Sequence, residues 1–130
     1  MAKEQIKPED DYVKMYPVFK KMIETQKLSP TETKILWACV FNSEMHTNHI
    51  QNPDMSRMTI FDFSMLAGVH EKTMERTLPK MIRKEIIDRV FVDGQNHVVL
   101  NPYLAHRGPE VRTDIRRHFM NSKWAKMSRE

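Results

Sequence analysis

Apolar residues near the start of the chain recur at the three- and four-residue spacing of one helical face. Six such positions lie between residues 11 and 27: Tyr12, Met15, Tyr16, Phe19, Met22 and Ile23. The spacing predicts a helix over 11–27. Pro17 falls inside the pattern, so we expect a kink or a separate first turn there. Residues 1–10 show no periodicity, and we expect them to form a flexible arm.

A second helix is predicted over residues 30–45. Ser29 can cap it, Pro30 suits its first position, and Glu32 completes a capping box. Apolar side chains follow on nearly all sides of this helix, which is typical of a helix at the centre of a domain. Cys39 lies in that apolar run, and we expect it to be a buried structural thiol rather than a nucleophile.

The polar segment 42–57 contains Asn52-Pro53-Asp54, a turn-forming cluster, and is predicted to be a loop. His46 and His49 in this segment have a spacing that could share a metal ion on a helix. No cysteine and no carboxylate pattern completes a ligand set around them. We therefore predict no metal site.

Two short helices are predicted next, over 59–66 with Thr59 as the cap and over 71–85. Gly68 is expected to supply a positive-φ corner between them, with Val69 filling the space beside it. The second helix buries Met74, Leu78 and Met81 or Ile82, and this arrangement leaves its basic and hydroxyl side chains outside. This pattern is typical of a helix-turn-helix, in which the leading turns of the second helix contact DNA bases.

The period then changes to that of β-strands. Two β-branched runs surround Asp93-Gly94 within residues 88–101, which predicts a hairpin. A helix-turn-helix followed directly by a hairpin is the order of a winged helix. The predicted fold class is therefore mainly α with a β-hairpin wing, a winged helix-turn-helix with flanking N- and C-terminal helices. Its domain spans 11–107, and a basic C-terminal helix over 108–130 follows it.

Positive charge is concentrated at the end of the chain. The net charge is +4, and residues 1–102 hold equal numbers of basic and acidic side chains, 14 of each. Residues 103–130 hold seven basic and three acidic side chains. Basic side chains on phosphates release condensed counterions. We expect DNA phosphate contacts from Arg107, Arg112, Arg116 and Lys123, although a solvated helix face would give the same composition.

Composition narrows the remaining possibilities. A chain of 130 residues suits one domain, and one cysteine allows no internal disulfide. No apolar run approaches the length of a membrane span, and the charged first residues do not resemble a signal peptide, so we expect a cytoplasmic protein. No phosphate-binding glycine loop, carboxylate pair or nucleophile triad is present. We predict a binding protein without catalytic residues or cofactors.

The chain resembles the RepL-type replication proteins of small plasmids from Gram-positive bacteria and related phage winged-helix proteins. The resemblance covers residues 12–119 and rests on "YVKMY", "LSPTETKIL", "LAGVHEKTMERTLPKMIRKEIIDR" and, above all, "HVVLNPYLAHRG". Residues 46–58 and 120–130 have no counterpart in it, and Pro79 interrupts the second helix of the pair. The resemblance implies replication initiation at a plasmid or phage origin, with host replication proteins as further partners.

The predicted function is sequence-specific binding of double-stranded DNA. The recognition-helix candidates are His70, Glu71, Lys72, Thr73, Arg76, Lys80 and Arg83. The wing candidates are Gln95, Asn96 and His97. Transcriptional repression is the alternative role, and a protein-interaction module without DNA binding is a further alternative. We also predict a homodimer, because the first and last helices hold more apolar surface than the core needs, through Tyr12, Met15, Phe19, Ile115, Phe119 and Trp124.

Overall fold

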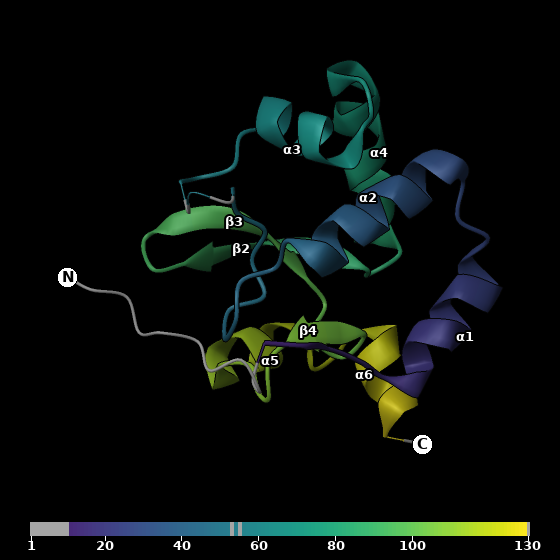
Figure 1. The fold of residues 1–130 in the computed structure, drawn as a ribbon. Coiled ribbons are helices and arrows are strands. Elements are labelled where there is room, and N and C mark those ends of the chain that lie inside the picture. Colours follow the sequence, from purple (N-terminus) through teal and green to yellow (C-terminus); the bar gives the residue numbers. More distant parts are fainter. Residues whose placement is uncertain (1–10, 53, 55, 130) are drawn as a thin grey trace.

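The computed structural model describes residues 11–52, 54 and 56–129. In this part of the chain the fold is mixed α/β, with six helices and two small antiparallel sheets of two strands each. Figure 1 shows helices α3 and α4 at one end of the molecule and α5, α6 and β4 at the other, with α2 and the β2–β3 hairpin between them. The predicted arm 1–10 lies outside the described residues.

The N-terminal segment differs from the prediction. Strand β1, Val13–Met15, pairs with β4, and helix α1 spans Pro17–Gln26 only. The residue before a proline is disfavoured in the helical region, and Tyr16 accordingly has an extended backbone (φ −88°, ψ 155°). The helix predicted over 11–27 therefore begins at Pro17, and Tyr12 and Met15 are exposed.

Helix α2, Pro30–Phe41, starts as the sequence predicts. The Ser29 hydroxyl accepts a hydrogen bond from the Glu32 backbone N–H, and the Glu32 carboxylate accepts one from the Ser29 N–H. The predicted buried thiol is confirmed, since Cys39 is fully buried and burial raises its pKa. The helix ends four residues before the predicted boundary. The Glu32 carboxylate also pairs with Lys84 at 2.6 Å, and this ion pair ties α2 to the end of α4.

Helices α3, Ile60–Ala67, and α4, Glu71–Arg83, pack against each other and against α2. Thr59 and Asp62 form a capping box at the start of α3. Gly68 ends α3 in the left-handed region (φ 69°), as predicted for the corner between the helices. Met74, Leu78 and Met81 are the buried side of α4.

Strands β2, Ile87–Val92, and β3, Gln95–Leu100, form a hairpin whose turn is Asp93-Gly94 alone. Both turn residues have positive φ (48° and 89°), as the type I′ two-residue hairpin turn requires. The segment 48–50, predicted to be loop, extends this sheet. Its backbone bonds join Ile50 N–H to the Val98 carbonyl and Leu100 N–H to the Asn48 carbonyl.

The segment after the hairpin fastens the two ends of the molecule together. Asn101 is fully buried, and its side-chain amide donates to the Glu85 carbonyl and to the Ser122 hydroxyl. Strand β4, Ala105–Arg107, then pairs with β1. Gly108 has a φ of 79°, and a Cβ there would lie 2.9 Å from the Met45 side chain, so this position requires glycine.

The C-terminal region contains two helices instead of one. Helix α5 is Thr113–Phe119, and α6 is Lys123–Ser128. The Ser122 hydroxyl accepts a hydrogen bond from the Ala125 N–H and so starts a new helix. A small apolar cluster packs α5 against the hairpin: Val90, Val92, Val99, Val111, Ile115 and Phe119.

Most of the apolar side chains from which a dimer was predicted are buried within the chain. Trp124 is fully buried in the main core, and its indole N–H donates to the Lys84 carbonyl. Phe19, Ile115 and Phe119 are each no more than 5% exposed, because α1 packs on α6 and α5 packs on the hairpin. Four of the six side chains are therefore buried within the chain, whereas Tyr12 and Met15 are exposed, and the homodimer stays a prediction.

Candidate nucleic-acid interface

The outer face of α4 carries a stripe of four basic side chains. At 3.6 residues per turn, Lys72, Arg76, Lys80 and Arg83 fall within an arc of about 80°, and all four are exposed. We call these four residues the α4 stripe. Among the residues that the structure describes, none of the four takes part in an ion pair. The stripe is therefore free to contact a polyanion.

The other predicted recognition residues lie beside the stripe. His70 and Glu71 are exposed at the start of α4, whereas Thr73 is half-buried. Glu75, one turn on, is also exposed and adds a second carboxylate to this flank. Pro79 is exposed beside the stripe, on the solvent side of the helix, where the carbonyl that it leaves without a helical partner can meet water.

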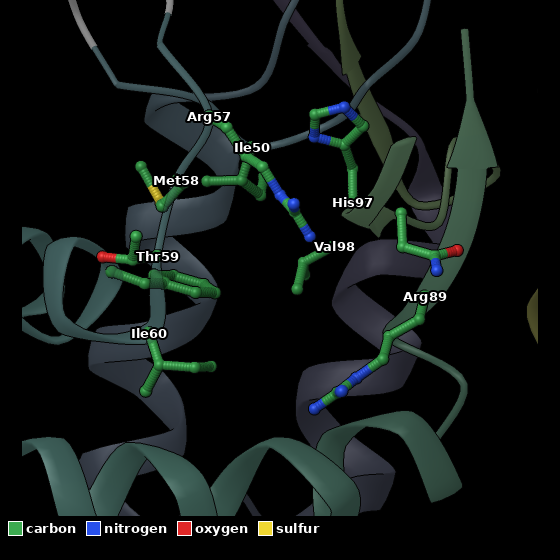
Figure 2. Close-up of a pocket in the computed structure, with 10 residues that line it drawn as sticks. Ile50, Arg57, Met58, Thr59, Ile60, Arg89, His97 and Val98 are labelled. Carbon is green, nitrogen blue, oxygen red and sulfur yellow. The ribbon is translucent and has the colours of Figure 1, made fainter. Parts of the chain in front are cut away.

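A pocket of about 310 Å³ separates the start of α3 from the hairpin. Its apolar floor includes Ile50 and Phe63, and its polar lining includes Arg57, Arg89, Asn96 and His97. Figure 2 shows the side chains of Arg57 and Arg89 reaching into this space from opposite sides. We call it the arginine pocket.

The electrostatics of the arginine pocket favour an anion. No carboxylate is among its lining residues within the described part of the chain. Partial burial lowers the pKa of His97, and the positive charge of Arg57 acts in the same direction. The negative charge of Asp93 opposes these two effects, so the two guanidinium groups, and not the pKa of His97, are what favour an anion here.

The three wing candidates lie in strand β3. Gln95 and Asn96 lie in strand β3 beyond the two-residue turn, paired with Val92 and Phe91, and both are exposed. Phe91 is 67% exposed. Alternation along β2 gives it the same face as Arg89. An exposed aromatic side chain beside the arginine pocket can pack on a sugar or a base.

Two of the four predicted phosphate contacts have partners within the protein. Arg107 donates to the Ser43 and Phe41 carbonyls and pairs with Asp11. Arg112 pairs with Asp93 of the hairpin turn at 3.0 Å and with Asp114 at 2.7 Å. Both guanidinium groups fasten segments of the fold together. Arg116 and Lys123 are exposed, and each lies over an aromatic ring, Tyr103 and Trp124 respectively.

Arg57 and Arg89 were not among the residues predicted from the sequence. A signal for Arg89 was present, since the alternation of β2 puts Val90 and Val92 inside and Arg89 and Phe91 outside. Arg57 had no such signal, because it lies outside regular secondary structure and is brought to the hairpin only by tertiary folding.

Comparisons of the chain with protein-family models, with curated proteins and with solved structures find no match. None of the described helices is long and apolar enough to cross a membrane.

Proposed function

We propose that this protein binds double-stranded DNA in a sequence-specific manner through a winged helix-turn-helix. The order of elements supports this proposal. Helix α2, the paired segment 48–50, helices α3 and α4, and the β2–β3 hairpin follow one another along the chain. This is the order in which winged-helix proteins place a helix pair and then a wing.

The observation that carries the proposal is the α4 stripe. In the proposed complex, the leading turns of α4 enter the major groove, where Arg76 can donate two hydrogen bonds to a guanine. Lys72 and Thr73 lie one turn earlier, and Lys80 and Arg83 continue the stripe toward the end of α4. Base contacts at the start of the helix then specify the sequence, and the later cations hold phosphates.

The arginine pocket adds a second anchor in the proposed complex. Arg57, Arg89 and His97 surround a space that suits a backbone phosphate, and Asn96 can donate a neutral hydrogen bond beside them. Phosphate contacts of this kind fix the register of α4 on the duplex without reading its bases. The stripe and the pocket therefore have separate roles, one in specificity and one in positioning.

Exposed apolar side chains on the outer side of α3 favour a second candidate function. Phe61 and Met65 are 55% and 68% exposed and stand four residues apart on that helix. A pair of this kind is typical of a protein contact, as a protein-interaction module would require. It is also compatible with DNA binding, since an initiator recruits host replication proteins and a repressor commonly acts with partners.

The proposal is tested by selecting binding sites for the purified protein from random-sequence DNA duplexes. We expect a defined motif to be enriched and to bind at least about a thousandfold more tightly than random duplex. Iterated copies of the motif at an origin would identify replication initiation, and one palindrome at a promoter would identify repression. Binding without any enriched motif, or no binding at low salt, would contradict the proposal.

A further inference from the structure

A second polar pocket, of about 320 Å³, lies at the end of the molecule away from α3 and α4. We call it the distal pocket. Its lining comes from the residue before α1, from the segments on both sides of β4 and from β4 itself, from α5, and from the end of α6. The lining residues are Tyr16, Pro102, Tyr103, His106, Val111, Arg116, Ser128 and Arg129.

The charge of the distal pocket has one sign. Arg116 and Arg129 supply two guanidinium groups, and no carboxylate is among its lining residues in the described part of the chain. The Arg116 guanidinium lies 5.6 Å from the centre of the Tyr103 ring, a stacking that orients its N–H groups. One of the Arg129 nitrogens donates to the Met120 carbonyl, which leaves its other donors for a ligand.

His106 gives the distal pocket a buried polar wall. It is 4% exposed, and its Nε2 lies 2.7 Å from the Tyr16 hydroxyl. Its Nδ1 has no hydrogen-bond partner among the residues that the structure describes. Burial lowers the pKa of His106, the nearby backbone of Gly108 and Arg107 opposes this effect, and the charges of Lys14 and Arg116 add to it. His106 and Tyr16 therefore give the distal pocket polar side chains beside its two guanidinium groups.

We propose that the distal pocket binds a small phosphate monoester. Two guanidinium groups match the several acceptor oxygens of a phosphate dianion, which arginine recognises with paired hydrogen bonds. Pro102, Val111 and the Tyr103 ring provide an apolar wall for the organic group of the ester. The volume suits a small ligand, because it lies at the lower limit of ordinary ligand pockets.

The test uses phenyl phosphate as the probe and isothermal titration calorimetry of the full chain without DNA. We expect saturable one-to-one binding of phenyl phosphate, weaker binding of inorganic phosphate, and no binding of phenol. No saturation at millimolar phenyl phosphate would overturn the proposal, and so would equal binding of phenol. Inorganic phosphate binding as tightly as the ester would exclude the monoester as the ligand class.

Matched variants localise the probe. Arg116→Ala is expected to weaken phenyl phosphate binding at least about tenfold, and Arg116→Lys to weaken it less. Arg117→Ala is the control, because Arg117 is the exposed neighbour on α5, carries the same charge and does not line the pocket. Equal losses of phenyl phosphate affinity in Arg116→Ala and Arg117→Ala would show that only the net charge of the protein matters, and would refute the site.

Competition with DNA separates a metabolite site from a backbone phosphate site. A saturating 20-base-pair duplex is expected to leave phenyl phosphate affinity unchanged within about twofold. Displacement of the probe by the duplex would assign the distal pocket to the DNA interface and overturn the proposal. Because the calorimetric binding of phenyl phosphate is measured without DNA, its outcome does not depend on whether the proposed DNA binding is correct.

Discussion

At the scale of single residues, two buried asparagines stabilise the base of the hairpin through side-chain hydrogen bonds. The Asn48 amide donates to the Leu100 and Ala105 carbonyls. The Asn101 amide nitrogen donates to the Glu85 carbonyl and the Ser122 hydroxyl, and its oxygen accepts a hydrogen bond from the Tyr103 N–H. These side chains therefore bond to backbone groups at the ends of β3 and β4 and after α4. The "LNPYLAHRG" segment of the resemblance is therefore explained by structural roles, which include the hydrogen bonds of Asn101 and the glycine requirement at 108.

Asn101→Ala is expected to lower the free energy of unfolding by about 2–4 kcal/mol, because it leaves several buried polar groups without partners. Equilibrium urea denaturation measures this loss. Asn96→Ala is the control, since Asn96 is an exposed amide on the same hairpin, and it should change stability by less than about 0.5 kcal/mol. Equal effects of the two substitutions would contradict the role assigned to Asn101.

His97 makes the proposed DNA binding depend on pH. Burial and Arg57 lower its pKa in the free protein, Asp93 opposes this effect, and the His49 ring lies 4.4 Å from the His97 ring. A phosphate in the arginine pocket would raise that pKa, so binding would take up a proton. Affinity should therefore rise as the pH falls from about 7.5 to about 6.

The pH dependence is measured as duplex affinity by fluorescence anisotropy at constant ionic strength. His97→Gln should remove most of the increase at low pH. His118→Gln should retain it, because His118 is bonded to Asp88 outside the arginine pocket. A wild-type pH profile in His97→Gln would show that no phosphate lies near His97.

At the scale of elements, local sequence signals located the helices and the hairpin better than their ends. The capping box of α2, the Gly68 corner and the Asp93-Gly94 turn act through neighbouring residues, so the sequence alone reveals them. The β1–β4 pair and the segment 48–50 depend on partners about 50 to 90 residues away. No local sequence pattern indicates those partners. The predicted first helix was therefore too long, because it included the residues that pair with β4.

The same distinction applies to the candidate interface. The periodicity of α4 predicted which of its side chains face outward, and four of them form the α4 stripe. The arginine pocket required Arg57, from irregular structure, to meet Arg89 on a strand. The predicted roles of Arg107 and Arg112 overlooked internal acceptors, because a sequence gives the charge of a side chain but not its folded neighbours.

Arg57 and Arg89 should contribute affinity but no base preference. Substituting either by alanine is expected to lower the slope of log affinity against log salt by about 0.9, with the preferred motif unchanged. Anisotropy titrations over a range of salt concentrations, on the selected and a random duplex, measure both properties. A changed motif would place these arginines on bases, and an unchanged salt slope would remove the arginine pocket from the interface.

At the scale of the whole molecule, the basic C-terminal region is part of the folded core. Deleting residues 121–130 would remove Trp124 and Ala125, which are both fully buried. Such a truncation would disrupt folding, so it cannot measure how the basic residues contribute to DNA binding. The contribution of any basic residue must instead be measured by substitution at exposed positions. The α4 stripe offers such positions, and so do helices α1 and α5.

The most direct test compares two double variants that lose the same charge, by anisotropy on the selected duplex. Lys72→Ala/Arg76→Ala alters the α4 stripe, and Lys21→Ala/Arg117→Ala removes exposed charges from α1 and α5. The α4 variant should lose at least about tenfold in affinity and also its sequence preference. The control should stay within about threefold of the unaltered protein and keep its preference. Equal losses in both variants, or an intact preference without Lys72 and Arg76, would contradict recognition of DNA by α4.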